Sequence, residues 1–60
     1  MLKVVLDAMG GDNAPGEIVK GAVLGVQQIS DIKIILVGDE TRIKEILNEY
    51  SYDTDRIEIL

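Results

Sequence analysis

Apolar residues in this chain gather into three short runs, separated by two longer segments in which they recur periodically. The runs are LKVVLD at residues 2–7, IKIILVG at residues 32–38 and RIEIL at residues 56–60. Nearly continuous apolar runs of this length are typical of strands buried on both faces of a parallel sheet. We therefore predict three strands, of which the first two are buried on both faces.

The first intervening segment, residues 15–29, predicts a helix, because its apolar residues recur at steps of three and four positions. Two starts fit the sequence: either Asn13 caps the helix, or the loop continues to Gly16. Gly21 and Gly25 each cost roughly 1 kcal/mol relative to alanine inside a helix, so we expect them to allow close packing against the sheet. The apolar face consists of Ile18, Val19, Ala22, Val23, Val26 and Ile29.

The second intervening segment predicts another helix, for which Asp39 is a suitable N-cap residue. Its apolar residues follow the i, i+3, i+4, i+7 spacing of one helical face. Glu40 and Lys44 are spaced for an ion pair on the outer side of this helix, which contributes about 0.2 to 0.5 kcal/mol. The apolar face consists of Ile43, Ile46, Leu47 and Tyr50.

The order strand, helix, strand, helix, strand predicts an α/β fold with a parallel sheet and right-handed crossovers. Two such crossovers in the same sense place both helices on one face, so the other face stays open to water unless further residues cover it. We expect residues 1–60 to be the N-terminal part of a single larger α/β domain. Ligands of such folds bind beyond the carboxyl ends of the strands, where the loops AMGGDNAP and VGDE are expected.

Composition and charge exclude several classes of function. The chain has no cysteine and no histidine, which removes disulfides, thiolate metal sites and the commonest general base. Eleven acidic residues outnumber six dispersed basic residues, giving a net charge of −5, so we expect no nucleic-acid binding. No signal-peptide core and no apolar run of about 20 residues is present. The expected location is the cytoplasm.

The glycine-rich loop does not match the common phosphate-binding motifs. Neither Gly10 nor Gly11 continues into the GxGxxG dinucleotide fingerprint. Gly11 and Gly16 have the spacing of a Walker loop, but Glu17 and Ile18 stand where lysine and serine or threonine are required. An acid at that position would repel a phosphate.

A metal site in this loop is not expected, and two other interpretations remain. A magnesium or phosphoaspartate site at Asp7 would need a second acid two positions later, where Met9 stands, so we expect no metal. Gly10 and Gly11 instead allow backbone amides to face a ligand, flanked by Asp7 and Asp12. The structural alternative is that the glycines only form a tight turn, while the polar residues only end a strand or cap a helix.

The segment VVLDAMGGDNAP resembles the N-terminal signature of the bacterial phosphate acyltransferases of phospholipid synthesis. The segments ILVGDET and TDRIEIL also resemble that family in order and spacing, so the resemblance covers all 60 residues. DAMGGD is its most specific part. Many members carry histidine at the position of Asn13, which argues against this residue as a proton carrier.

The resemblance implies a three-layer α/β/α fold with a mainly parallel sheet, similar to isopropylmalate dehydrogenases and phosphotransacetylases, and usually homodimeric. It implies acyl transfer from acyl-[acyl-carrier-protein] to inorganic phosphate, which gives an acyl phosphate for phospholipid synthesis. The implied partners are acyl-carrier protein and phosphate, with no metal or redox cofactor. Any membrane association would be peripheral and through other regions, and the 60 residues alone are expected to be inactive.

The candidate substrate-binding residues all belong to the loop after the first strand; no catalytic residue is assigned. We expect the two acids to orient the loop, or to pair with basic residues elsewhere, while the glycine amides contact substrate. A non-catalytic α/β binding module, receiver-like or with a nucleotide pocket, is the alternative. The candidates are Asp7, Gly10, Gly11, Asp12 and Asn13.

Overall fold

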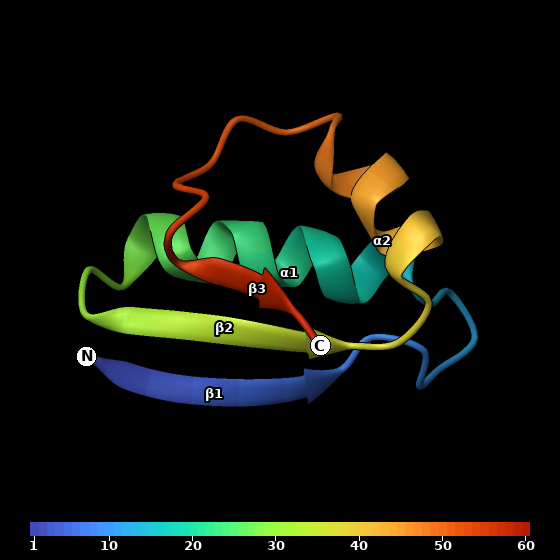
Figure 1. Cartoon of the computed structure of the whole chain (residues 1–60), viewed down its shortest axis with the longest axis horizontal. Helices are drawn as coiled ribbons and strands as arrows, with labels where there is room; N and C mark the ends of the chain where they lie inside the picture. The colour runs from blue at the N-terminus through green and yellow to red at the C-terminus, as the bar shows by residue number, and fades with distance from the viewer.

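The computed structural model describes all 60 residues and shows three strands and two helices in the predicted alternation (Figure 1). The α/β class predicted from the apolar pattern is therefore confirmed. Neither helix combines the length and the apolar character needed to cross a membrane. The elements are β1 (Leu2–Asp7), α1 (Gly16–Gln28), β2 (Ile32–Val37), α2 (Glu40–Leu47) and β3 (Ile57–Ile59).

The strands form one parallel sheet in the order β1-β2-β3. Leu2 lies opposite Ile32 at the start of the first ladder, and Asp7 lies opposite Val37 at its end. In Figure 1 the strand arrows run in the same direction, and α1 runs alongside β2. The loops that follow β1 and β2 therefore leave the sheet at one shared edge, the carboxyl edge.

One hydrophobic core joins both helices to the same face of the sheet. Side chains of β2 alternate, so that Ile32, Ile34 and Leu36 are buried while the residues between them are half-buried. No polar or charged side chain is buried. The core side chains are Ala8, Val19, Ala22, Val23, Val26, Ile32, Ile34, Leu36, Ile43, Leu47 and Ile57.

The opposite face of the sheet has no helix over it, as the topology predicted. Val5 is 62% exposed there, and its neighbour Ile35 is half-buried. Lys33 and Glu58 form an ion pair of 3.7 Å across the same face. The prediction that the first two strands are buried on both faces is therefore wrong for this chain, because a parallel strand is buried on both faces only where helices cover both.

Helix α1 begins at Gly16, which confirms the later of the two predicted starts. Pro15 occupies the N-cap position, and no side chain caps the helix. The cap predicted at Asn13 is wrong, because this residue lies in a turn before the helix, where its backbone carbonyl accepts a hydrogen bond from the Glu17 amide (3.2 Å).

The two glycines inside α1 have different surroundings. A Cβ atom at Gly25 would lie 3.5 Å from Cδ1 of Ile34, which is ordinary contact with the sheet. A Cβ atom at Gly21 would meet no atom within 4 Å. The prediction of close packing against the sheet is therefore wrong for Gly21, which has open space around its Cβ position.

Helix α2 begins with the predicted cap and ends earlier than its apolar pattern suggested. The amide of Arg42 donates to Oδ1 of Asp39 (3.3 Å), and the predicted pair of Glu40 and Lys44 is present at 3.2 Å. The helix ends at Leu47, so the prediction that Tyr50 extends its apolar face is wrong. A four-residue turn, in which the Tyr50 amide donates to the Leu47 carbonyl, replaces the helical pattern there.

Replacing Asp39 by alanine should lower the free energy of unfolding by about 1 kcal/mol, because an N-terminal amide of α2 loses its side-chain acceptor. Urea denaturation of a full-length protein carrying this segment measures the change. Asp39→Asn is the matched control, since asparagine caps helices about as well as aspartate. An equal loss in both variants would contradict a capping role.

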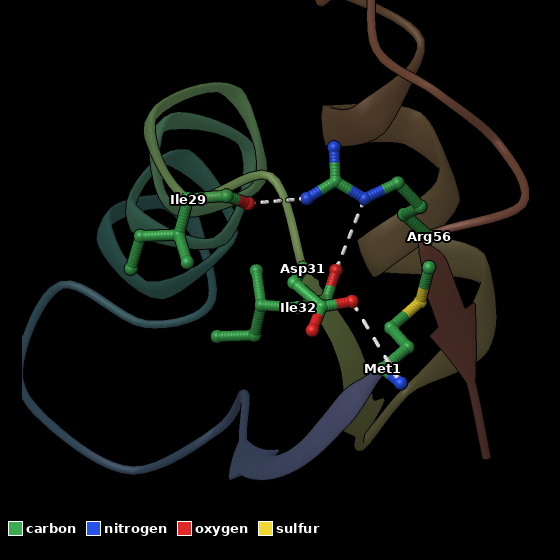
Figure 2. A network of polar contacts seen from close by, with 5 residues as sticks. All are labelled: Met1, Ile29, Asp31, Ile32 and Arg56. Carbon is green, nitrogen blue, oxygen red and sulfur yellow. Dashed lines mark hydrogen bonds and ion pairs between the residues drawn. The ribbon is translucent and has the colours of Figure 1, made fainter.

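At the amino edge of the sheet, Arg56 connects three segments (Figure 2). Its Nε donates to the Ile32 carbonyl (3.1 Å), and its guanidinium also donates to the Ile29 carbonyl at the end of α1. The N-terminal ammonium of Met1 lies 3.7 Å from the Asp31 carboxylate beside it. Arg56 thus satisfies carbonyl groups that α1 and β2 leave free, which is a structural role at the edge opposite to the glycine loop.

Candidate functional site

The candidate site is the loop of residues 8–15, which connects β1 to α1 at the carboxyl edge. The ladder continues one residue beyond β1, because the Ala8 amide donates to the Val37 carbonyl (2.9 Å). Ala8 is fully buried and anchors the start of the loop in the core. The loop therefore begins directly beside Gly38, the first residue after β2.

Asp7 turns its side chain back onto the loop. Its Oδ1 accepts a hydrogen bond from the Met9 amide (2.9 Å). A Cβ atom at Gly10 would lie 3.5 Å from Oδ2 of the same carboxylate, so the chain passes close over Asp7. Aspartate side chains commonly bond the backbone two residues on in this way and stabilise a turn. This contact supports the expected loop-orienting role of Asp7.

Gly10 and Gly11 form the exposed tip of the loop. Gly11 has φ +111°, a conformation that residues with side chains rarely adopt, and a Cβ atom there would meet nothing within 4 Å. The amides of both glycines donate to no acceptor in the chain. Two adjacent N–H groups without a partner in the chain are thus free to bind an acceptor such as a phosphate or carbonyl oxygen.

Asp12 and Asn13 are exposed, and the structure gives their side chains no partner. Asn13 takes part only through its backbone carbonyl, which accepts from Glu17. Of the five candidate residues, the structure therefore brings two close together, Asp7 and Gly10. Met9, which lies between them, donates its amide to Asp7. Substrate binding by any of the five residues stays a prediction.

The charges that these loops carry are mainly acidic. Asp7 and Asp12 flank the glycines, and Asp39 follows Gly38 in the adjacent turn. No group of three or more His, Cys, Asp or Glu side chains is placed to hold a metal ion, and these 60 residues enclose no pocket. The loop thus has amide donors available for an anion, and any cationic groups must be added from other segments.

Sequence reasoning missed one contact at this edge. Gly38 has φ +157°, and a Cβ atom there would lie 2.6 Å from Cγ and 3.0 Å from Sδ of Met9. The Met9 side chain thus lies directly on the bare backbone of the β2–α2 turn. The glycine directly after the second apolar run was the available signal, because glycine after a strand often marks a close approach of two segments.

A parallel β-α-β-α-β unit with free amides in the loop after its first strand defines an α/β protein with a candidate anion-binding loop at the carboxyl edge. The chain belongs to the family described as "Fatty acid synthesis protein", whose model matches residues 2–60. The resemblance stated from VVLDAMGGDNAP is thereby confirmed.

Several relatives are named phosphate acyltransferase. The chain is 54% identical over 56 residues to the protein of Acetivibrio thermocellus, covering 93% of this chain and 16% of that protein. It is 53% identical over 58 residues to the protein of Fusobacterium nucleatum, covering 97% and 18%. For Dictyoglomus turgidum the identity is 51% over 59 residues, covering 98% and 17%. The chain thus spans less than a fifth of the length of these curated relatives.

Proposed function

We propose that this chain is part of an acyltransferase of lipid synthesis that transfers a fatty acyl group from acyl-carrier protein to inorganic phosphate. The observation that carries the proposal is the pair of free amides at Gly10 and Gly11, at the edge where α/β folds bind ligands. Membership of a fatty acid synthesis family and relatives named phosphate acyltransferase support the same reaction.

In the proposed reaction an oxygen of inorganic phosphate attacks the carbonyl carbon of the acyl thioester. The tetrahedral intermediate collapses with cleavage of the carbon–sulfur bond, and the carrier thiolate leaves with the electron pair. The products are the acyl phosphate and the free carrier thiol after protonation. A thiolate is a good leaving group, so no strong general acid is required, in keeping with a loop that has none.

The glycine loop contributes hydrogen-bond donors to this reaction. Donors fixed in advance stabilise a phosphate or a developing oxyanion because they need no reorganisation when the charge forms. The bond from the Met9 amide to Asp7 fixes the turn that presents the Gly10 and Gly11 amides. Asp7 and Asp12 would repel a phosphate as direct ligands, so we propose that basic residues outside this chain balance the charge.

The proposal is tested by incubating a full-length protein carrying this segment with acyl-[acyl-carrier-protein] and varying inorganic phosphate. We expect thioester loss that requires phosphate, together with formation of an acyl phosphate, which hydroxylamine traps as a hydroxamate after the remaining acyl-[acyl-carrier-protein] has been removed. A binding module with the same fold would give no thioester loss at any phosphate concentration. Thioester loss that is independent of phosphate would indicate hydrolysis and would also refute the proposed reaction.

A further inference from the structure

The β2–α2 turn is the only other loop that begins at the same edge as the glycine loop. The proposed function assigns it no role. Asp7 and Val37 are register partners at the ends of β1 and β2, and the Ala8 amide extends their ladder. The two loops therefore start from adjacent, hydrogen-bonded points of the sheet. The contact of Met9 with Gly38 is one through which a change in either loop can act on the other.

This contact depends on the missing side chain at Gly38. The modest contact of a Cβ atom with Cδ1 of Ile43, at 3.3 Å, could be relieved at the flexible end of that side chain. The contact with Met9 Cγ at 2.6 Å could not, because Cγ lies close to the Met9 backbone and real Cβ contacts are essentially never so short. Any side chain at position 38 must therefore displace Met9.

Met9 directly precedes Gly10 and is held at two points. Its amide donates to Asp7, and its half-buried side chain lies on Gly38. Gly10 and Gly11 are exposed and their amides are unpaired, and only the Gly11 carbonyl is held, by a hydrogen bond from the Ala14 amide (3.4 Å). The position of Met9, directly before Gly10, therefore influences how these two amides are oriented.

We propose that Gly38 is a positioning residue for the phosphate-binding loop, which it holds in place through the Met9 side chain. This inference rests on the proposed function, since it assigns how the Gly10 and Gly11 amides are aimed at phosphate. In this proposal Gly38 acts through Met9 and needs no contact with substrate. Its effect is expected on the binding of phosphate rather than on the stability of the fold.

The test compares Gly38→Ala, Met9→Ala and the double variant in the full-length protein, by steady-state kinetics at varied inorganic phosphate. Gly38→Ala should raise the KM for phosphate about tenfold or more, because small displacements of positioning groups are costly. Since both residues act through one contact, the double variant should match Met9→Ala alone, instead of showing the product of the two effects. Gly21→Ala, a glycine with open space around it, is the matched control and should leave the KM unchanged.

Several outcomes would overturn the inference. An unchanged KM for phosphate in Gly38→Ala, or independent multiplication of the two single effects, would show that Gly38 does not act through Met9. A lowered melting temperature with the KM unchanged would assign Gly38 a structural role only. If Gly38→Ala fails to fold, Met9→Ala decides: a raised KM supports the inference, and an unchanged KM refutes it.

The proposed function can fail separately. If wild-type protein consumes thioester in a phosphate-dependent manner and Gly11→Val abolishes this, the function stands whatever Gly38→Ala does. If wild-type protein shows no phosphate-dependent turnover, the proposed function fails, and the positioning role built on it is refuted with it.

Discussion

Replacing Gly11 by valine should abolish phosphate-dependent turnover while leaving the fold intact. Valine is strongly disfavoured at φ +111°, so the loop must adopt another conformation, which changes the orientation of the free amides. Loss of a preorganised donor lowers kcat by about 10²- to 10³-fold in comparable sites. Two adjacent donors are affected here, so turnover should fall to background.

Steady-state kinetics with acyl-[acyl-carrier-protein] and phosphate measure this loss, and circular dichroism with a thermal melt checks the fold. Gly16→Val is the matched control, because it places the same side chain at a nearby glycine with open space and no positive φ. We expect it to retain turnover. Unchanged kinetics in Gly11→Val, or equal losses in the two variants, would refute the role of the Gly11 amide.

Replacing Leu36 by alanine should cost about 2 to 5 kcal/mol of unfolding free energy, which is the largest stability effect expected in this segment. Leu36 is fully buried in the central strand, where it lies between Leu6 of β1 and Ile59 of β3 in the register. The core contains only 11 side chains, so a cavity at its centre has few neighbours that could move to fill it. Urea denaturation of the full-length protein measures the change.

Leu24→Ala is the matched control for this prediction. Leu24 lies on α1 with 44% of its surface exposed, so the same truncation removes little buried area. Alanine also has the highest helix propensity, which offsets part of the loss. We expect a change below about 1 kcal/mol. If Leu24→Ala and Leu36→Ala lowered the unfolding free energy equally, Leu36 would not lie at the centre of the core.

The sequence predicted best those features that depend on neighbours within a few residues. The apolar runs at residues 2–7 and 32–38 are β1 and β2, and the cap at Asp39 is present, because propensity and capping are local effects. Tyr50 shows the limit of a local pattern. Its spacing fits a helical face, but the spacing does not encode where the helix ends.

The sequence also predicted those features of the candidate site that depend on local effects. The position of the glycine loop after β1 follows from the order of elements, and the turn held by Asp7 spans only two residues. The contact of Met9 with Gly38 joins residues from different loops. It depends on the register of β1 against β2, which no local pattern specifies.

The sequence by itself determined the order of strands and helices, the place of DAMGGD at the carboxyl edge, and the family to which the chain belongs. Only the tertiary structure decided that Val5 is exposed, that Gly21 has open space around it, and that Met9 lies on Gly38. The physical reason is that backbone preference and periodicity are set by adjacent residues. Burial and close approach are set instead by segments that meet only when the chain has folded.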